Sequence, residues 1–200
     1  MFEYDGMMAE AVTTDTQRIA RGLRQKDVAL LHELVEQYQF RLVRYLIYLL
    51  GRRDFVDDLV QETWLRVLER GSSYDGRSRF EPWLFTIARN LAIDHIRKGR
   101  ISSLDSNAEE EQDTALQTPP SNAPSPFTLA ARTEDAERLA ASLQTLEPIY
   151  REALVLRFQE ELSLQEISGV VGAPVATVAS RIYRGLRTLR SQLEGGKHEI

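Results

Sequence analysis

The chain lacks cysteine altogether and has only three histidines among its 200 residues. The absence of cysteine excludes disulfide bonds, thiolate zinc sites and cysteine nucleophiles. Three scattered histidines argue against a transition-metal site. We expect no metal, and the interpretation reached below predicts no cofactor and no catalytic residues. A reducing cytoplasmic environment is compatible with this composition.

Long apolar runs are also missing. The longest, residues 45–50, is far shorter than the roughly 18 residues that a membrane-spanning helix needs. The N-terminal residues 1–5 are acidic and carry no apolar run, which is not typical of a secretory signal. We therefore expect no membrane insertion by the chain itself.

Strand-like alternation is nearly absent, whereas helical periodicity covers most of the sequence. Hydrophobic residues make up 42% and charged residues 28%, which excludes a wholly disordered chain. We predict an all-α fold of two helical domains joined by a flexible linker. The expected boundaries are an N-terminal extension at 1–15, a first domain at 16–100, a linker at 101–133, a second domain at 134–194 and a tail at 195–200.

The linker prediction depends on composition. Residues 101–133 contain five acidic residues and one basic residue, a Glu run at 109–111 and four prolines between 119 and 126. Such a segment has too few apolar side chains to offset the entropy of ordering. The positive charge lies elsewhere: residues 174–200 have five basic and two acidic residues, although the whole chain has a net charge of -5.

A helix-turn-helix is predicted near the C-terminus. Ser163 and Glu166 have the spacing of a capping box, residues 172–174 form a Gly-Ala-Pro turn, and a long helix follows. One face of that helix is apolar, at Val175, Val178, Ile182, Leu186 and Leu189. The opposite face carries the residues that we predict to bind DNA: Thr177, Ser180 and Arg181 in the major groove, Arg184 and Arg187 at phosphates. The alternative is an amphipathic helix whose arginines only keep it in solution.

Two surfaces are predicted in the N-terminal part. A helix at 54–70 gathers Asp58, Gln61, Glu62 and Leu65 on one face, which suits a basic partner, although a single exposed leucine has little meaning alone. A helix at 82–98 is apolar except for a narrow polar strip, and the loop before it places aromatic residues beside arginines. This pattern favours unstacked single-stranded bases, and the predicted contacts are Tyr74, Arg77, Arg79, Trp83, Asn90, Asp94, Arg97 and Lys98. The alternative assigns Phe80 and Trp83 to the core.

Residues 57–67 and 80–98 resemble region 2 of bacterial sigma factors of the extracytoplasmic-function (ECF) type, and residues 146–167 and 174–185 resemble their region 4. The resemblance implies a non-enzymatic subunit that binds core RNA polymerase and directs it to the promoters of a stress-related regulon. It assigns Asp58, Gln61, Glu62 and Leu65 to core polymerase. It assigns the loop and strip around Asn90 to the melted -10 element, and the helix at 175–190 to the -35 element.

The resemblance further implies that the acidic linker threads the polymerase channels, that promoter melting needs no nucleotide hydrolysis and that an anti-sigma factor controls the protein. One departure concerns the first helix of the helix-turn-helix. Ser168 and Gly169 stand where the family usually carries alanines, and we expect them to loosen that helix.

Two other functions remain open from the residues alone. The chain could be a stand-alone regulator whose N-terminal domain binds a ligand or dimerises. It could also be a recombinase or nuclease that uses Asp57, Asp58 and Glu62 as metal ligands, although neighbouring carboxylates on a helix point to different faces and converge poorly on one ion.

Overall fold

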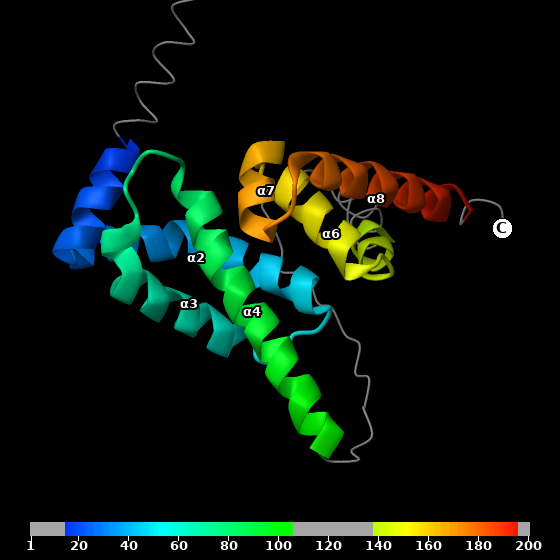
Figure 1. The fold of residues 1–200 in the computed structure, drawn as a ribbon, viewed down its shortest axis with the longest axis horizontal. Coiled ribbons are helices and arrows are strands. Elements are labelled where there is room, and N and C mark those ends of the chain that lie inside the picture. The colour runs from blue at the N-terminus through cyan, green and yellow to red at the C-terminus, as the bar shows by residue number, and fades with distance from the viewer. Residues whose placement is uncertain (1–14, 106–137, 196–200) are drawn as a thin grey trace, which may run out of the picture.

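The computed structural model describes residues 15–105 and 138–195, which we call the N-terminal half and the C-terminal half (Figure 1). All regular structure in these two ranges is helical, which confirms the predicted fold class. The linker prediction falls on residues 106–137 for most of its length and, like the predictions for residues 1–14 and the tail beyond 195, lies outside the described residues.

The N-terminal half is a bundle of helices around one apolar core. It consists of a helix at 15–25, α2 (Val28–Leu50), α3 (Val56–Arg70), the short 3-10 turn η1 (Gly71–Ser73) and α4 (Phe80–Asp105). The helix α4 continues seven residues beyond the expected end at Lys98.

The break before α2 follows from local capping. The Asp27 carboxylate accepts hydrogen bonds from the backbone N–H groups of Ala29 and Leu30, at 2.9 and 3.3 Å, and so satisfies donors that the first turn leaves unpaired. At the other end, Gly51 has a φ of 73° and donates its N–H to the carbonyl of Ile47. A glycine suits this left-handed position because it has no Cβ to clash.

The core of this half forms where α2 meets α3 and α4. Leu42, Leu46 and Leu84 are fully buried, and the rings of Tyr45 and Phe85 meet edge to face at 5.0 Å. Each such side chain contributes roughly 1.5–3 kcal/mol when it leaves water. This packing fixes α4, which carries most of the predicted single-strand contacts, as a rigid element.

The C-terminal half contains a helix at 138–144, α6 (Pro148–Leu154), the π-helical turn η2 (Val155–Gln159), α7 (Leu164–Val171) and α8 (Val175–Gly195). The predicted capping box is confirmed, because Ser163 Oγ accepts from the Glu166 N–H and Glu166 Oε2 accepts from the Ser163 N–H. Gly172, with a φ of 63°, ends α7 in the left-handed conformation and turns the chain into α8.

Ser168 has the opposite effect from the one expected. Its hydroxyl donates a 2.6 Å hydrogen bond to the carbonyl of Ala173, and the Ala173 N–H donates to the carbonyl of Ser168. These two bonds close the turn between α7 and α8. The serine therefore ties the helix-turn-helix together, which an alanine at this position would not do.

The buried face of α8 differs in detail from the predicted one. Val178, Ile182 and Leu189 are buried as expected, but Val175 and Leu186 are 37% and 43% exposed. Gly185 occupies the middle of the buried seam, since a Cβ there would lie 3.1 Å from Leu154 Cδ1 of α6. Because α6 approaches α8 at Gly185, the buried face of α8 is centred on that side of the helix and not on Leu186.

The two halves are in contact with each other. Helix α7 packs against α4, and α6 packs against α2. Figure 1 shows α7 beside the N-terminal part of α4, with α8 extending away from the N-terminal half.

Gly169 provides a test of helix stability within the motif. It lies exposed on α7 with a helical backbone and no atom within 4 Å of a built Cβ. We expect Gly169→Ala to raise the free energy of unfolding by about 0.5–1 kcal/mol, because alanine loses less backbone entropy in a helix. Thermal unfolding followed by circular dichroism measures the change.

Gly172→Ala is the matched control. That position also has open space around it but a φ of 63°, so the substitution is expected to lower the melting temperature. A destabilised Gly169→Ala protein would contradict the helical assignment of that residue.

Candidate polymerase and nucleic-acid interfaces

The outer face of α8 presents the predicted -35 residues together. Thr177, Ser180, Arg184 and Arg187 are exposed and Arg181 is half-buried. None of the three arginines forms an ion pair within the described ranges, whereas Arg190 is bound to Glu194 at 2.7 Å. Guanidinium groups without a carboxylate partner are available to phosphates and base edges.

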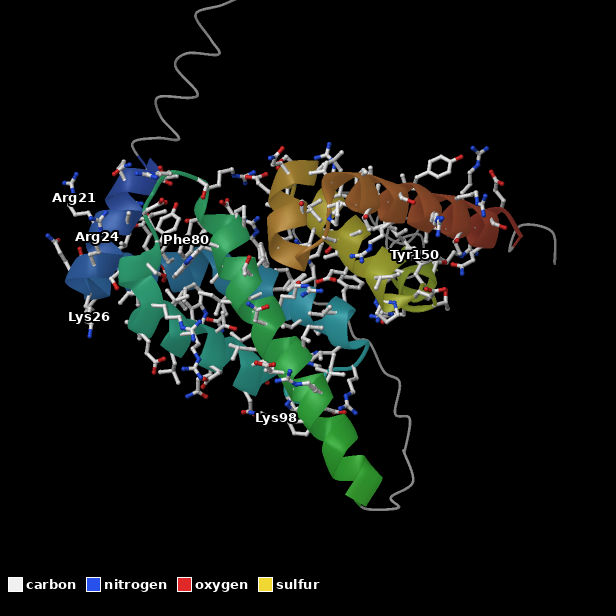
Figure 2. All side chains as sticks on the ribbon, viewed as in Figure 1. Arg21, Arg24, Lys26, Phe80, Lys98 and Tyr150 are labelled. Carbon is white, nitrogen blue, oxygen red and sulfur yellow. The ribbon has the colours of Figure 1, made fainter. Side chains whose placement is uncertain are left out.

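A shallow hollow lies beside this face. It has a volume of about 500 Å³ and is lined by Ala176, Thr177, Ser180, Arg181 and Arg184 of α8 together with Ile149 and Tyr150 of α6. Sequence reasoning missed Ile149 and Tyr150. Tyr150 lies in the C-terminal half below α8 (Figure 2). No signal in the sequence indicated that the start of α6 borders the recognition helix.

The polar strip of α4 is largely exposed as predicted. Asn90, Asp94, Arg97 and Lys98 are all accessible, and Lys98 lies well along α4 from Phe80 (Figure 2). Asp94 and Arg97 form a 3.1 Å ion pair with each other at the surface. Asn90 and Lys98 have no such partner among the described residues, so these two groups are the least committed part of the strip.

The helix at 15–25 contacts the loop at 71–79 and holds it in place. Thr16 Oγ1 donates a 2.8 Å hydrogen bond to the carbonyl of Gly76. Gly76 has a φ of 72°, and a Cβ there would lie 2.9 Å from both Ala20 Cβ and the Thr16 carbonyl oxygen. The close approach therefore requires glycine and places the loop in one position.

Tyr74 requires a correction. Its side chain is only 2% exposed, its hydroxyl donates to the Ser78 carbonyl at 2.6 Å, and its ring packs on Phe80 and Trp83. Burial raises the pKa of the Tyr74 hydroxyl. The ring thus supports the loop from inside and is not available for base stacking in this structure. Phe80 is likewise a core residue, at 1% exposure.

The loop arginines differ in their surroundings. Arg77 is exposed and lies 3.6 Å from Asp75, whereas Arg79 is partly buried and bound to Glu81 at 3.1 Å. Burial lowers the pKa of Arg79, and the carboxylates of Glu81 and of Glu166 on α7 raise it, with a net upward shift. Arg79 directly precedes α4, the helix against which α7 packs. Trp83, four residues further along the chain, is half-buried.

The predicted polymerase surface lies on α3. Asp58, Gln61 and Leu65 are exposed and Glu62 is partly so, with a 3.0 Å ion pair to Arg66. Leu65 is 46% exposed, and Leu68, which sequence reasoning missed, is 38% exposed one turn further on. A hollow of about 330 Å³ borders this surface between α2 and α3. The alternative explanation assumed a single, isolated exposed leucine. The structure instead has two exposed leucines beside acidic groups.

Sequence reasoning also missed a basic cluster at the end of the helix at 15–25. Arg21, Arg24 and Lys26 are exposed and project from the end of the helix at 15–25 and the turn that follows (Figure 2). The signal was present, because three cations follow one another at 21–26 with no acid between them. The hydrogen bond from Thr16 places this helix against the loop at 71–79.

The residues of the nuclease alternative do not converge. Asp57 and Asp58 are exposed, Glu62 is paired with Arg66, and no group of three potential metal ligands occurs in residues 15–105 and 138–195. In the same ranges no helix has the length and hydropathy needed to cross a membrane.

Comparison with known proteins places the chain in a family. Residues 34–101 match the model of Sigma-70 region 2, and residues 136–189 match that of Sigma-70 region 4. The ECF sigma factor SigW of Bacillus subtilis is 32% identical over 163 residues, which are 80% of this chain and 87% of SigW. SigE of Mycolicibacterium smegmatis is 36% identical over 162 residues, which are 80% of this chain and 60% of SigE.

Solved structures agree with this placement. The sigma factor RpoE of Bartonella quintana, solved with the anti-sigma factor NepR, has a TM-score of 0.69 at 23% identity and covers 82% of this chain and 96% of its own. CnrH, solved with the cytosolic domain of CnrY, has a TM-score of 0.63 at 25% identity and covers 90% and 99%. The chain belongs to the ECF family of RNA polymerase sigma factors, whose role is promoter-specific initiation of transcription.

Base reading and phosphate binding on α8 can be separated by substitution. We expect Arg181→Ala to weaken binding of the holoenzyme to its selected promoter by about 1–3 kcal/mol and to relax preference at the base it contacts. Arg187→Ala should weaken binding about equally for all sequences and reduce the salt slope by about 1. Fluorescence anisotropy against salt concentration, with duplexes selected from a random pool, distinguishes the two. Equal effects of both variants on all sequences would contradict the assignment.

The α3 surface gives a complementary prediction. Leu65→Asp should weaken the affinity for core polymerase at least tenfold without unfolding the N-terminal half, because an exposed apolar contact of the docking face is replaced by a charge. Co-elution with core polymerase and circular dichroism provide the measurements. Leu139→Asp, at a leucine of similar exposure in the C-terminal half, is the control and should retain core binding. An unfolded Leu65→Asp protein would show that Leu65 is structural.

Proposed function

We propose that the exposed face of α8 binds the -35 element in the major groove, with Thr177, Ser180 and Arg181 at base edges and Arg184 and Arg187 at phosphates. The observation that carries this proposal is the row of unpaired arginines on a helix that is positioned by a capped α7 and a hydrogen-bonded turn. The N-terminal part of a recognition helix reads bases while its later residues meet the backbone. The hollow beside Tyr150 extends the same surface.

The -10 element is assigned to the loop at 71–79 and the strip on α4. Arg77, Arg79, Trp83, Asn90, Asp94, Arg97 and Lys98 remain the proposed contacts, with Tyr74 as their internal support. Unstacking a base costs a few kcal/mol, and stacking on an aromatic ring returns about 1–3 kcal/mol per base. Binding of the melted strand can therefore offset strand separation without nucleotide hydrolysis, and the protein needs no catalytic residue.

Core RNA polymerase is assigned to the α3 surface formed by Asp58, Gln61, Glu62 and Leu65, to which we add Leu68. An acidic rim around exposed leucines suits a basic helical partner, because the apolar centre supplies affinity and the charges supply orientation. The proposal keeps a first domain at 16–100, a second at 134–194 and a linker at 101–133 that passes through the polymerase channels, although residues 101–105 belong to α4.

Control by an anti-sigma factor is part of the proposal. Two structural neighbours, RpoE and CnrH, were solved with the anti-sigma factor NepR and with the cytosolic domain of CnrY, and this chain shares their fold. We propose that it too is held by an inhibitor in the cytoplasm and is released to transcribe a stress-related regulon.

Reconstituted transcription tests the proposed function. Purified chain and bacterial core polymerase are mixed with a library of genomic fragments, and the 5′ ends of the transcripts are sequenced. Transcripts that depend on the chain and share sequences near -35 and -10 are the expected result. Core polymerase with the Leu65→Asp variant is the control. No transcripts above those of core polymerase alone would contradict the proposal.

A further inference from the structure

Three exposed cations at the end of the helix at 15–25 take no part in the proposed function. Arg21, Arg24 and Lys26 form no ion pair within the part of the chain that the structure describes. Figure 2 shows all three at one edge of the N-terminal half. Clustered positive charge that the chain itself does not neutralise attracts polyanions, of which nucleic acid is the commonest.

The carboxylates around this cluster are already engaged. Glu33 of α2 binds Arg18 at 2.7 Å, and Arg18 also contacts Asp15 at 3.2 Å. The Asp27 carboxylate accepts the two hydrogen bonds that cap α2. Since these acidic groups have partners of their own, the three cations are available to a ligand from outside the chain.

Lys26 keeps its charge at a conformational cost. Its φ is 54°, in the left-handed region that favours glycine, and its N–H donates to the Leu23 carbonyl at 3.3 Å where the helix ends. Glycine would end the helix at this position without strain. A strained residue that persists is a sign of function, and what lysine adds over glycine at this exposed position is a long cationic side chain.

The cations border the loop at 71–79. Gln17 Nε2 donates to the carbonyl of Gly76 at 3.4 Å, so the helix face that carries Gln17 lies against the loop. Arg21 and Arg24 follow Gln17 by four and seven residues, and this spacing places them on the same face of an α-helix. The row of cations therefore begins beside the loop and continues its surface.

The helix that carries the row is firmly held in the N-terminal half. Ile19, Ala20 and Leu23 are almost completely buried, and a Cβ on Gly71 would lie 3.0 Å from Leu23 Cβ. The beginning of the loop thus rests on the same helix as its middle. This packing positions the backbone of the row before a ligand arrives, so binding requires little further ordering.

The position of the row fits a DNA strand that continues past the loop. In Figure 1 the helix at 15–25 and α4 lie on either side of the loop, so a strand bound along α4 and over the loop leads onto the row. Arg21 and Arg24 are separated by about 4.5 Å along the helix axis. Successive charges of one DNA strand are about 3.4 Å apart along a duplex axis, which allows neighbouring phosphates to contact both arginines.

We propose that Arg21, Arg24 and Lys26 bind phosphates of the promoter strand where it leaves the loop at 71–79 on the side away from α4. The inference rests on the proposed function, because it takes this loop as the holder of unpaired bases of the -10 element. Phosphate contacts carry no sequence information, but they fix the position and direction of the strand. The row thus adds affinity for every promoter and holds the strand while the loop and α4 read its bases.

Removal of two charges from the row tests the proposal in the holoenzyme, formed from the full chain and core polymerase. The probe is a labelled single strand that carries the -10 sequence shared by the reconstituted transcripts, either with its flanking nucleotides or trimmed to the element. We expect Arg21→Gln/Arg24→Gln to weaken binding of the flanked strand at least about fivefold at low salt and to reduce the salt slope by about 1.4, which is about 0.7 for each lost contact. Binding of the trimmed strand should stay unchanged.

The matched control removes two neighbouring arginines at the opposite end of α2. Arg52 and Arg53 are exposed and follow the last residue of α2, whereas the row precedes its first. We expect Arg52→Gln/Arg53→Gln to leave the affinity and the salt slope unchanged for both probes. Equal weakening by the two double variants, or an unchanged affinity of Arg21→Gln/Arg24→Gln for the flanked strand, overturns the proposal.

Lys26→Gly separates binding from folding, because glycine fits the left-handed backbone at this position. We expect a melting temperature no lower than that of the parent chain, together with a salt slope reduced by about 0.7 for the flanked strand. Circular dichroism and fluorescence anisotropy provide the two measurements. A lower melting temperature with an unchanged salt slope would show that Lys26 serves the fold, and would overturn its assignment to phosphate.

Co-elution with core polymerase distinguishes DNA from a protein partner. We expect the Arg21→Gln/Arg24→Gln chain to co-elute as the parent chain does, and loss of co-elution would assign the row to polymerase and overturn the proposal. Failure of the parent holoenzyme to bind the -10 strand would contradict the proposed function itself. Binding by the parent with an unaffected double variant would contradict only the role of the row.

Discussion

Glu160, held between Arg41 and Arg44, is the most deeply buried ionic contact between the two halves of the molecule. A buried ion pair adds little net stability, because the cost of removing both charges from water cancels most of their attraction. Removal of one partner is different and costs about 3–5 kcal/mol, since a charge then remains buried alone. The contact is therefore selective in orientation while it contributes only modestly to stability.

Each binding surface is built within its own half and does not depend on this contact. The recognition helix α8 is positioned by the capped α7, by the Ser168 hydrogen bond and by the close approach of α6 at Gly185. The strip on α4 is positioned by the packing of Leu84 and Phe85 in the N-terminal core. A change in how the halves lie against each other would thus leave both proposed surfaces intact.

Local rules gave the helices of this chain correctly because their causes are local. The Ser163 and Glu166 box and the glycine turn both follow from hydrogen bonds within a few residues. The exposure of Asn90, Lys98, Arg184 and Arg187 also followed from helical periodicity.

The errors arose where contacts between distant parts of the chain decide whether a side chain is buried or paired. Tyr74 was assigned to bases, since nothing local indicates that its ring lies under Phe80 and Trp83. Leu186 was assigned to the buried face, because the approach of α6 to Gly185 is invisible in a periodic pattern. The pairing of Glu160 with Arg41 joins residues 119 positions apart, and a single sequence carries no signal of that kind.

The π-helical turn at Val155–Gln159 has an evolutionary consequence. A π turn differs from an α turn by one inserted residue, and one residue rotates everything after it by about 100° around the helix axis. Loss of that single residue would rotate Glu160 away from α2 and would also turn α7 and α8 relative to α6. A one-residue deletion at this turn would therefore change both the contact of Glu160 with Arg41 and Arg44 and the packing of α8 on Leu154.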